Sequence, residues 1–292
     1  MTCEKNVMIF WIASYPKSGN TWLRALISTY YYSENGVFDD KLLKKIDQFP
    51  TKRYFEEFKY DKKLAGDTCK LWIQAQEKVN AQNQIKFFKT HNTFGKVNNH
   101  DFTNKQNSIG CLYVVRDPRN VITSLKNHYQ LNDEQAIQWV TNDKNFIYNV
   151  QDFENSGFSD FQSISSWSMN YKSWIVQKKV PIKLIKYEDL INKTYAVFLE
   201  IVEFINDTTK NNQKIDKIKL KNTLKSTSFE ILKKNEIDKG FSEAVSSNKD
   251  KNKKISFFHL GPKNDWRKIL NTEIKVKLEK TFEKELKELT YI

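Results

Sequence analysis

The chain has 292 residues, of which 39% are hydrophobic and 28% are charged, so it is long enough for a sizeable core and too apolar for an intrinsically disordered protein. Cys3, Cys69 and Cys111 stand far apart, which argues against a disulfide framework or a zinc site, and no apolar run is long enough to span a bilayer. The net charge of +13 fits a lysine-rich soluble surface, a nucleic-acid-binding protein or a site for a polyanionic small molecule. We expect a cytoplasmic protein without stable membrane insertion.

Four apolar runs are predicted to be buried strands, and they lie at residues 7–14, 85–90, 109–115 and 182–186. Helical spacing of apolar residues follows at 21–32, 120–129 and 194–205. This alternation predicts an α/β fold in which helices flank a central parallel sheet, as a single domain over residues 1–292. Ligands bind such sheets beyond the carboxyl ends of the strands, where the unusual polar clusters of this sequence fall.

Three further helices are predicted at residues 160–177, 214–234 and 272–289. In the first of them, Trp167, Tyr171 and Trp174 share one face. Between the second and the third, residues 240–254 are polar and carry turn residues, which predicts a mobile loop or lid.

The sequence YPKSGNTW at residues 15–22, between a strand and a helix, has the composition of an anion site. A glycine lets the backbone turn tightly, the helix start adds its positive end, Lys17 adds a charge, and Ser18 and Thr21 add hydroxyls. An ordinary strand–helix loop with a capping threonine is the alternative. The segment is not a Walker A loop, which needs G-x-x-x-x-G-K-[ST], and this weakens the interpretation as a P-loop kinase.

The same segment resembles the 5′-phosphosulfate loop, usually Y-P-K-S-G-T-T-W, of sulfotransferases that use 3′-phosphoadenosine-5′-phosphosulfate (PAPS). The resemblance implies a P-loop-like nucleotide-binding architecture. It also implies transfer of the sulfuryl group to a hydroxyl or amine of a small-molecule acceptor, with 3′-phosphoadenosine-5′-phosphate (PAP) as product and without a metal. By the same resemblance Trp22 stacks on the adenine, and the 5′-phosphosulfate is bound by Lys17, Ser18, Gly19, Asn20 and Thr21. Asn20 stands where the family usually has threonine.

A second cluster, Lys89-Thr90-His91, ends the second predicted strand. Side chains alternate along a strand, so Lys89 and His91 project to the same side, and a neighbouring ammonium favours the neutral, proton-accepting form of a histidine. A solvated histidine at a strand end is the alternative. K-T-H after an apolar strand resembles the catalytic segment of the same family. The resemblance implies that His91 removes the acceptor's proton, that Lys89 positions acceptor and sulfuryl group, and that Lys17 stabilises charge on the leaving phosphate.

The segment from residue 113 to 129 resembles the family's 3′-phosphate segment: an apolar strand, Arg116, a turn, and Ser124 eight residues later. A guanidinium at a strand end can bind phosphate oxygens in a bidentate manner, although a surface ion pair would explain Arg116 as well. The resemblance extends to Tyr187 and Phe229, which would contact the adenine, and to Thr227, which would contact the nucleotide.

The last motif is altered. The family has R-K-G-x-x-G-D-W, and here residues 259–266 read HLGPKNDW, so Gly261 is retained while the two cations and the second glycine are replaced. We hypothesise that Lys263 partly substitutes for the missing cations at the 3′-phosphate, as a point charge without bidentate geometry. A solvated lysine is the alternative.

Two rival functions stay open at this point, a nucleotide kinase and a basic nucleic-acid-binding protein, although no nucleic-acid-binding motif is present. The acceptor is not specified by the sequence. An apolar or aromatic acceptor is suggested by Phe94, Phe146, Tyr148 and Trp167, which core packing explains equally well. A homodimer is compatible with the sequence.

Overall fold

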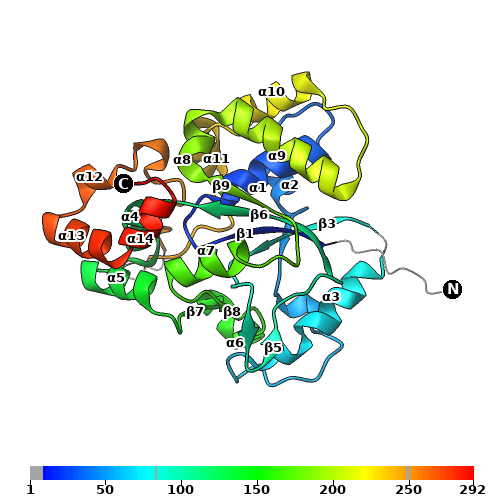
Figure 1. Ribbon diagram of the computed structural model, residues 1–292, viewed down its shortest axis with the longest axis horizontal. Coiled ribbons are helices and arrows are strands. Elements are labelled where there is room, and N and C mark those ends of the chain that lie inside the picture. The colour runs from blue at the N-terminus through cyan, green and yellow to red at the C-terminus, as the bar shows by residue number, and fades with distance from the viewer. Residues whose placement is uncertain (1–8, 83, 248–249, 251) are drawn as a thin grey trace.

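The computed structural model describes residues 9–82, 84–247, 250 and 252–292. A parallel sheet of five strands lies at its centre (Figure 1), with β2 at one edge and β9 at the other, in the order β2-β3-β1-β6-β9. The strands are β1 Ile9–Ser14, β2 Asp47–Gln48, β3 Lys86–Thr90, β6 Ser108–Val115 and β9 Ile182–Lys186. The predicted α/β fold with a central parallel sheet is thereby confirmed. The strand predicted at 7–14 begins before the described residues, and the short β2 was not predicted.

Both faces of the sheet are covered, which explains why its strands are apolar along their whole length. All six residues of β1 are buried. Ile9, Trp11 and Ala13 face one core, while Phe10 and Ile12 face the other. The first core is closed by α3 Trp72–Asn80, α4 Pro118–Tyr129, α5 Asp133–Thr141, α7 Trp167–Ile175, α13 Thr272–Thr281 and α14 Glu283–Glu288. The second is closed by α1 Asn20–Tyr32, α8 Tyr187–Asn192, α9 Thr194–Thr209 and α10 Lys217–Ser226.

The helix predicted at 160–177 is shorter than expected. Residues Gln162–Ser163 form strand β8, which pairs with β7 Phe146–Ile147, and α7 begins only at Trp167. The start is set by Ser166, whose hydroxyl accepts a hydrogen bond from the Met169 N–H as an N-cap. The predicted face of Trp167, Tyr171 and Trp174 is nevertheless buried as a unit.

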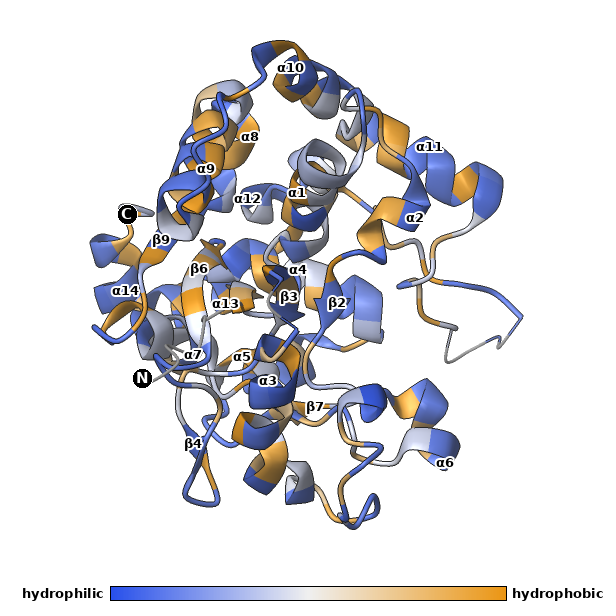
Figure 2. Cartoon of the chain, turned by 90° about the vertical axis from the view of Figure 1, so that its right-hand side faces the viewer, coloured by the Kyte–Doolittle hydropathy of each residue, from blue (hydrophilic) through white to orange (hydrophobic). Residues whose placement is uncertain are grey.

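The two other long helices are each divided. The segment predicted at 214–234 forms α10 and then α11 Phe229–Lys239, because Ser228 caps the second helix through the Ile231 N–H. The segment predicted at 272–289 breaks at Phe282, between α13 and α14. Helices α9, α10 and α11 are banded with apolar and polar residues in Figure 2, as expected of helices with one face on a core.

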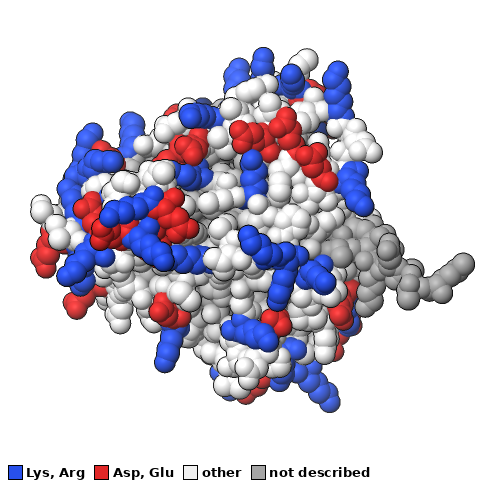
Figure 3. Space-filling view, viewed as in Figure 1, with Lys and Arg blue, Asp and Glu red and all other residues white. Residues whose placement is uncertain are grey.

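Charge is dispersed on the face drawn in Figure 3, where Lys and Arg side chains are mixed with Asp and Glu. Such mixing differs from the single-sign stripe that typically follows a nucleic-acid backbone. In the part of the chain that the structure describes, no helix is long and apolar enough to cross a membrane.

Candidate active site

A cavity of about 850 Å³ opens beyond the carboxyl ends of β1, β3 and β6. Among the residues predicted to be catalytic, it is lined by Lys17, Lys89 and His91. Among those predicted to bind the nucleotide, it is also lined by Gly19, Asn20, Thr21, Trp22, Arg116, Ser124, Tyr187, Phe229 and Gly261. Residues that lie more than 200 positions apart in the sequence therefore meet in one space. Ser18, Thr227 and Lys263 do not contribute to its wall.

The loop after β1 turns tightly at Gly19 and leads into α1. Gly19 has a φ of 100°, and a Cβ atom there would lie 2.4 Å from the Tyr187 ring, so only glycine fits. Because glycine has no side chain, the first N–H groups of α1 are not capped from that position and can bind an anion. The Asn20 side chain donates to the Ile12 carbonyl at 3.0 Å, so it ties the loop to β1.

Lys17 is the cation at the centre of this loop. Its Nζ lies 3.9 Å from the centroid of the Phe257 ring, a cation–π contact with a segment far along the chain. Burial, together with the nearby Lys89 and Arg116 charges, lowers the pKa of Lys17 to about 7, although Glu243 acts in the opposite direction. In the absence of a bound anion, the Lys17 side chain is therefore partly neutral near pH 7.

His91 is held as a neutral base. Its Nδ1 lies 2.7 Å from the Ser14 carbonyl, and a carbonyl can only accept, so Nδ1 carries the proton and Nε2 keeps its lone pair. Burial and the adjacent Lys89 charge lower the pKa of His91 to about 3. Its backbone N–H donates to Gln162 Oε1 at 2.8 Å, which fixes the end of β3.

Arg116 lies at the end of β6 and spans two parts of the site. Its guanidinium donates to the Lys17 carbonyl at 3.2 Å and to the Ser124 hydroxyl at 3.3 Å, and it lies 4.3 Å from the Tyr187 ring centroid. Its Nε is buried and has no hydrogen-bond partner among the described residues. Donors of this kind remain for an anion.

Trp22, Tyr187 and Phe229 form an aromatic lining. The Trp22 and Tyr187 rings meet edge to face at 5.9 Å, and the Trp22 indole N–H donates to the Thr227 carbonyl at 3.0 Å. Thr227 is fully buried, so its backbone carbonyl orients Trp22 while its side chain bonds back to α10. Gly261 has a φ of 54°, and a Cβ atom there would lie 2.2 Å from the Phe229 ring.

Sequence reasoning missed Asn264, which stands where the family motif has its second glycine. Its amide nitrogen donates to the Ser124 hydroxyl at 3.1 Å, and its amide oxygen accepts from Thr123 at 2.6 Å. The altered motif thus supplies a polar group beside Ser124, whereas Lys263 is exposed. The signal in the sequence that could have pointed to Asn264 was its replacement of a glycine in the family motif.

Sequence reasoning also missed Glu243, from the polar segment 240–254. Its carboxylate accepts from the Thr21 hydroxyl at 2.8 Å and from Arg24 at 2.5 Å, and it lies 3.7 Å from Lys89 Nζ. These cations and hydroxyl hold the pKa of Glu243 well below its usual range, against the effect of burial. The described part of the predicted lid is therefore fastened to the anion loop, while residues 248, 249 and 251 lie outside the described part.

The aromatic residues that suggested an apolar acceptor are mostly elsewhere. Trp167 is fully buried and donates to the Arg116 carbonyl, and Phe94 packs against Trp174. Phe146 stacks against its neighbours outside the cavity wall, and only Tyr148 lines the cavity. These rings therefore serve mainly in packing.

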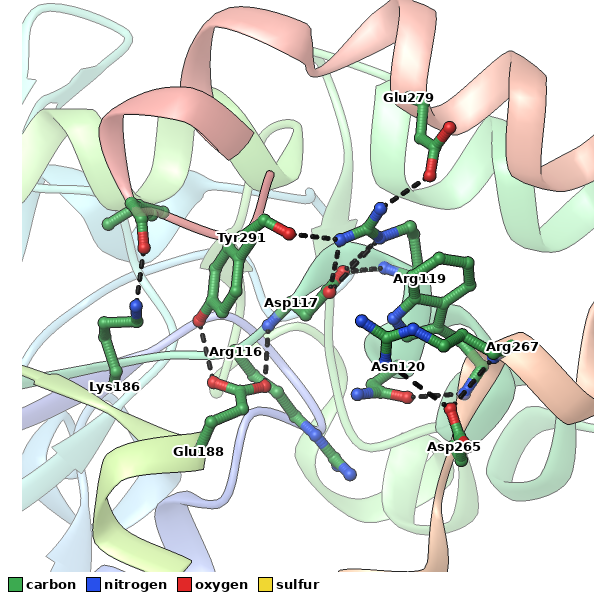
Figure 4. A network of polar contacts seen from close by, with 12 residues as sticks. Arg116, Asp117, Arg119, Asn120, Lys186, Glu188, Asp265, Arg267, Glu279 and Tyr291 are labelled. Carbon is green, nitrogen blue, oxygen red and sulfur yellow. Dashed lines mark hydrogen bonds and ion pairs between the residues drawn. The ribbon is translucent and has the colours of Figure 1, made fainter. Parts of the chain in front are cut away.

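A network of polar contacts beneath Arg116 fixes the turn that carries it (Figure 4). Arg119 forms an ion pair with Asp117 at 2.8 Å and donates to the Tyr291 carbonyl at 3.2 Å. Glu188 accepts from the Asp117 N–H at 3.1 Å and from the Tyr291 hydroxyl at 2.8 Å. The network thus joins the end of β6, helix α8 and the C-terminal segment. Together, the sheet and this site are those of an α/β enzyme with a P-loop-like nucleotide-binding architecture.

Comparison with known proteins gives the family. The chain belongs to the sulfotransferases, since the family described as "Sulfotransferase domain" matches residues 9–290. It is 23% identical over 284 residues to a flavonol sulfotransferase-like protein of Flaveria bidentis, covering 94% of this chain and 80% of that one. It is 25% identical over 235 residues to the luciferin sulfotransferase of Photinus pyralis, covering 77% and 56%.

Solved structures share the fold. Retinol dehydratase in complex with androsterone and PAP matches with a TM-score of 0.55 and 16% identity, over 97% of this chain and 82% of that one. A mouse sulfotransferase complexed with PAP matches with a TM-score of 0.51 and 14% identity, over 97% and 84%. No group of three or more His, Cys, Asp or Glu side chains that could hold a metal ion occurs within the described ranges.

Proposed function

We propose that this enzyme transfers the sulfuryl group of PAPS to a hydroxyl group of a small-molecule acceptor. The observation that carries the proposal is that Lys17, His91 and Arg116 line one cavity at the carboxyl end of a parallel sheet, as a group transfer between two bound molecules requires. The presence of PAP in related solved structures supports PAPS as the donor.

In the proposed reaction, His91 Nε2 accepts the hydroxyl proton while the acceptor oxygen attacks sulfur. The bond between sulfur and the 5′-phosphate oxygen breaks, and PAP leaves with the electron pair. Lys17 stabilises the charge that builds on the leaving phosphate, and Lys89 positions the sulfuryl group. The loop residues Ser18, Gly19, Asn20 and Thr21 form the cradle of the 5′-phosphosulfate, and of these Ser18 is buried behind the cavity wall.

For the rest of the nucleotide, we assign the adenine to Trp22, Tyr187 and Phe229, with Thr227 holding Trp22 and Gly261 leaving room for Phe229. Arg116 and Ser124 bind the 3′-phosphate.

The test is thermal unfolding of the full chain with PAP, with ATP and magnesium, and with a single-stranded oligonucleotide. A ligand at 100 times its dissociation constant stabilises the native state by about 2.7 kcal/mol, so PAP is expected to raise the unfolding temperature most. A larger shift with ATP–magnesium would favour a kinase, and a larger shift with the oligonucleotide would favour nucleic-acid binding.

Arg116 and Lys263 are the two candidate cations for the 3′-phosphate. Arg116 lines the cavity and Lys263 is exposed, so their variants can be compared directly. We expect Arg116→Met to lower the affinity for PAP much more than the affinity for adenosine 5′-phosphate, because a charge-assisted hydrogen bond contributes about 1.5–3 kcal/mol. Calorimetry on the parent, Arg116→Met and Lys263→Ala measures both ligands. A reduced preference for PAP in Lys263→Ala would show that this exposed lysine reaches the phosphate, and an unchanged preference would reject our hypothesis for it.

The lowered pKa of Lys17 predicts that PAP binding takes up a proton. At pH 7.5 the free protein has part of its Lys17 neutral, and an arriving anion raises that pKa and draws a proton from solution. Calorimetry in buffers of different ionisation enthalpy measures the uptake. Lys17→Arg keeps the charge without titrating, so it should show less uptake than the parent; equal uptake would assign the proton to another group.

Glu243 competes with the nucleotide for the same donors. Its carboxylate occupies the Thr21 hydroxyl and approaches Lys89, and its negative charge opposes a phosphate there. We expect Glu243→Gln to bind PAP about tenfold more tightly than the parent, a difference of about 1.4 kcal/mol. Glu203→Gln, on the exposed face of α9, is the control for the same change of charge. Weaker binding in Glu243→Gln would mean that the carboxylate supports the site.

A further inference from the structure

The end of the cavity next to His91 carries two glutamine amides beside the apolar Ile147. Gln162 of β8 accepts from the His91 N–H, and Gln48 of β2 lies in register with Lys89 of β3, two residues before His91. Both glutamines line the cavity. Amide groups on two sides of the base therefore face the space that an acceptor must enter.

Gln162 presents a fixed donor. Its side chain is buried, with 2% of the residue exposed, and its Oε1 is identified as the oxygen because it accepts from a backbone N–H at 2.8 Å. The amide nitrogen is then fixed as well, on a residue that lines the cavity, and it makes no hydrogen bond to the residues that the structure describes. A fixed donor at a cavity wall, without a partner in the protein, can bind an oxygen of the bound molecule.

Acceptor groups complete this end of the cavity. Asp160, which also lines it, lies two residues before Gln162, within about 7 Å along an extended chain. Its Oδ2 accepts from the Asn149 N–H at 2.9 Å, and its Oδ1 has no partner in the described part of the chain. Burial raises the pKa of this carboxyl. The wall therefore offers both hydrogen-bond donors and acceptors, beside the ring of Tyr148.

We infer that the acceptor is a polyhydroxylated small molecule of carbohydrate type. One hydroxyl of the acceptor reaches His91, and the neighbouring hydroxyls of the same molecule bind Gln162, Gln48 and Asp160. Hydroxyls suit this wall because each both donates and accepts, whereas a phenol or a sterol would leave the amides and the carboxyl unpaired. The inference rests on the proposed sulfuryl transfer and specifies its acceptor.

The first experiment uses the full chain, radiolabelled PAPS and two sets of acceptors. Methyl β-glucoside, methyl β-galactoside and trehalose represent polyols; 4-nitrophenol, 2-naphthol and androsterone represent aromatic and apolar acceptors. We expect kcat/KM for the best polyol to exceed that for any of the other three on the order of a hundredfold, because a site that hydrogen-bonds hydroxyls strongly rejects compounds without them. A preference for a phenol or sterol, or no labelled polyol, would overturn the inference. Calorimetry with PAP separates this from failure of the proposed function, since a chain that binds PAP still has its donor site.

The second experiment removes the amide donors one at a time. Gln162→Glu keeps the oxygen that accepts from His91 and loses the N–H group, and Gln48→Met removes an amide without adding charge. With the best polyol, KM should rise about fivefold or more in each variant while PAP affinity is unchanged. Gln138→Glu, on the exposed side of α5, is the matched control. A KM within twofold of the parent in both cavity variants would overturn the inference.

Discussion

Replacing His91 by asparagine should reduce kcat by about a hundredfold or more and leave PAP binding nearly unchanged. An asparagine amide can still donate to the Ser14 carbonyl, as His91 Nδ1 does now, so the end of β3 keeps its tie to β1. The lone pair of Nε2 is lost, and with it the group that we propose takes the acceptor's proton. Turnover and PAP affinity are measured separately, by sulfuryl transfer and by calorimetry.

His100→Asn is the matched control, because His100 is exposed on the short strand β5, His100–Asp101. Turnover of His91→Asn within threefold of the parent, about 0.7 kcal/mol of barrier, would exclude His91 as the base. The pH profile adds a second check. Protonation inactivates a base, and the pKa of His91 is about 3 instead of 6.5, so turnover should not fall through His91 titration between pH 8 and pH 5.5.

Replacing Arg119 by methionine should lower the free energy of unfolding by about 3–5 kcal/mol. The Arg119 and Asp117 side chains are 1% and 6% exposed, so loss of the guanidinium leaves a carboxylate buried without its counter-charge. The Trp266 ring, 3.9 Å from the guanidinium, and the Tyr291 carbonyl lose their contacts as well. Urea denaturation measures the change.

Arg267→Met serves as the control for this variant. Arg267 pairs with Asp265 at 3.7 Å, but its side chain is 67% exposed, and an exposed pair contributes about 1 kcal/mol or less. Both arginines are shown in Figure 4. Adding Asp117→Asn to Arg119→Met should recover part of the lost stability, since it removes the uncompensated charge. Equal losses in the two single variants would contradict the argument from burial.

The sheet could be predicted because each of its longer strands appears in the sequence as a short apolar run. A strand buried on both faces is apolar throughout, and each such run here is bounded by polar turn residues. Strand β2 leaves no such trace, since it consists of Asp47 and Gln48 alone. The helix boundaries at Ser166 and Ser228 were missed because helical spacing continues across them, while capping by a serine side chain decides where the helix starts.

The site residues likewise include some that the sequence could predict and others that it could not. His91 and Arg116 each follow a strand directly and Lys17 comes three residues after β1, so the topology predicts that they meet at one edge of the sheet. Glu243 comes from an irregular segment, lies 222 positions after Thr21, and is joined to it by no sequence pattern that would predict their contact. The direction of the Lys17 and His91 pKa shifts depends on burial among neighbours from several segments, which spacing along the chain does not contain.

The wall of the proposed nucleotide site has a consequence for the synthesis of the protein. Trp22 is oriented by a carbonyl 205 positions later, and Gly261 and Asn264 close the same space. A chain still growing on the ribosome lacks the complete proposed nucleotide site until almost its whole length has emerged. In the proposed binding mode a nucleotide contacts both the first and the last parts of the chain, so its binding should stabilise the whole fold and not a single segment.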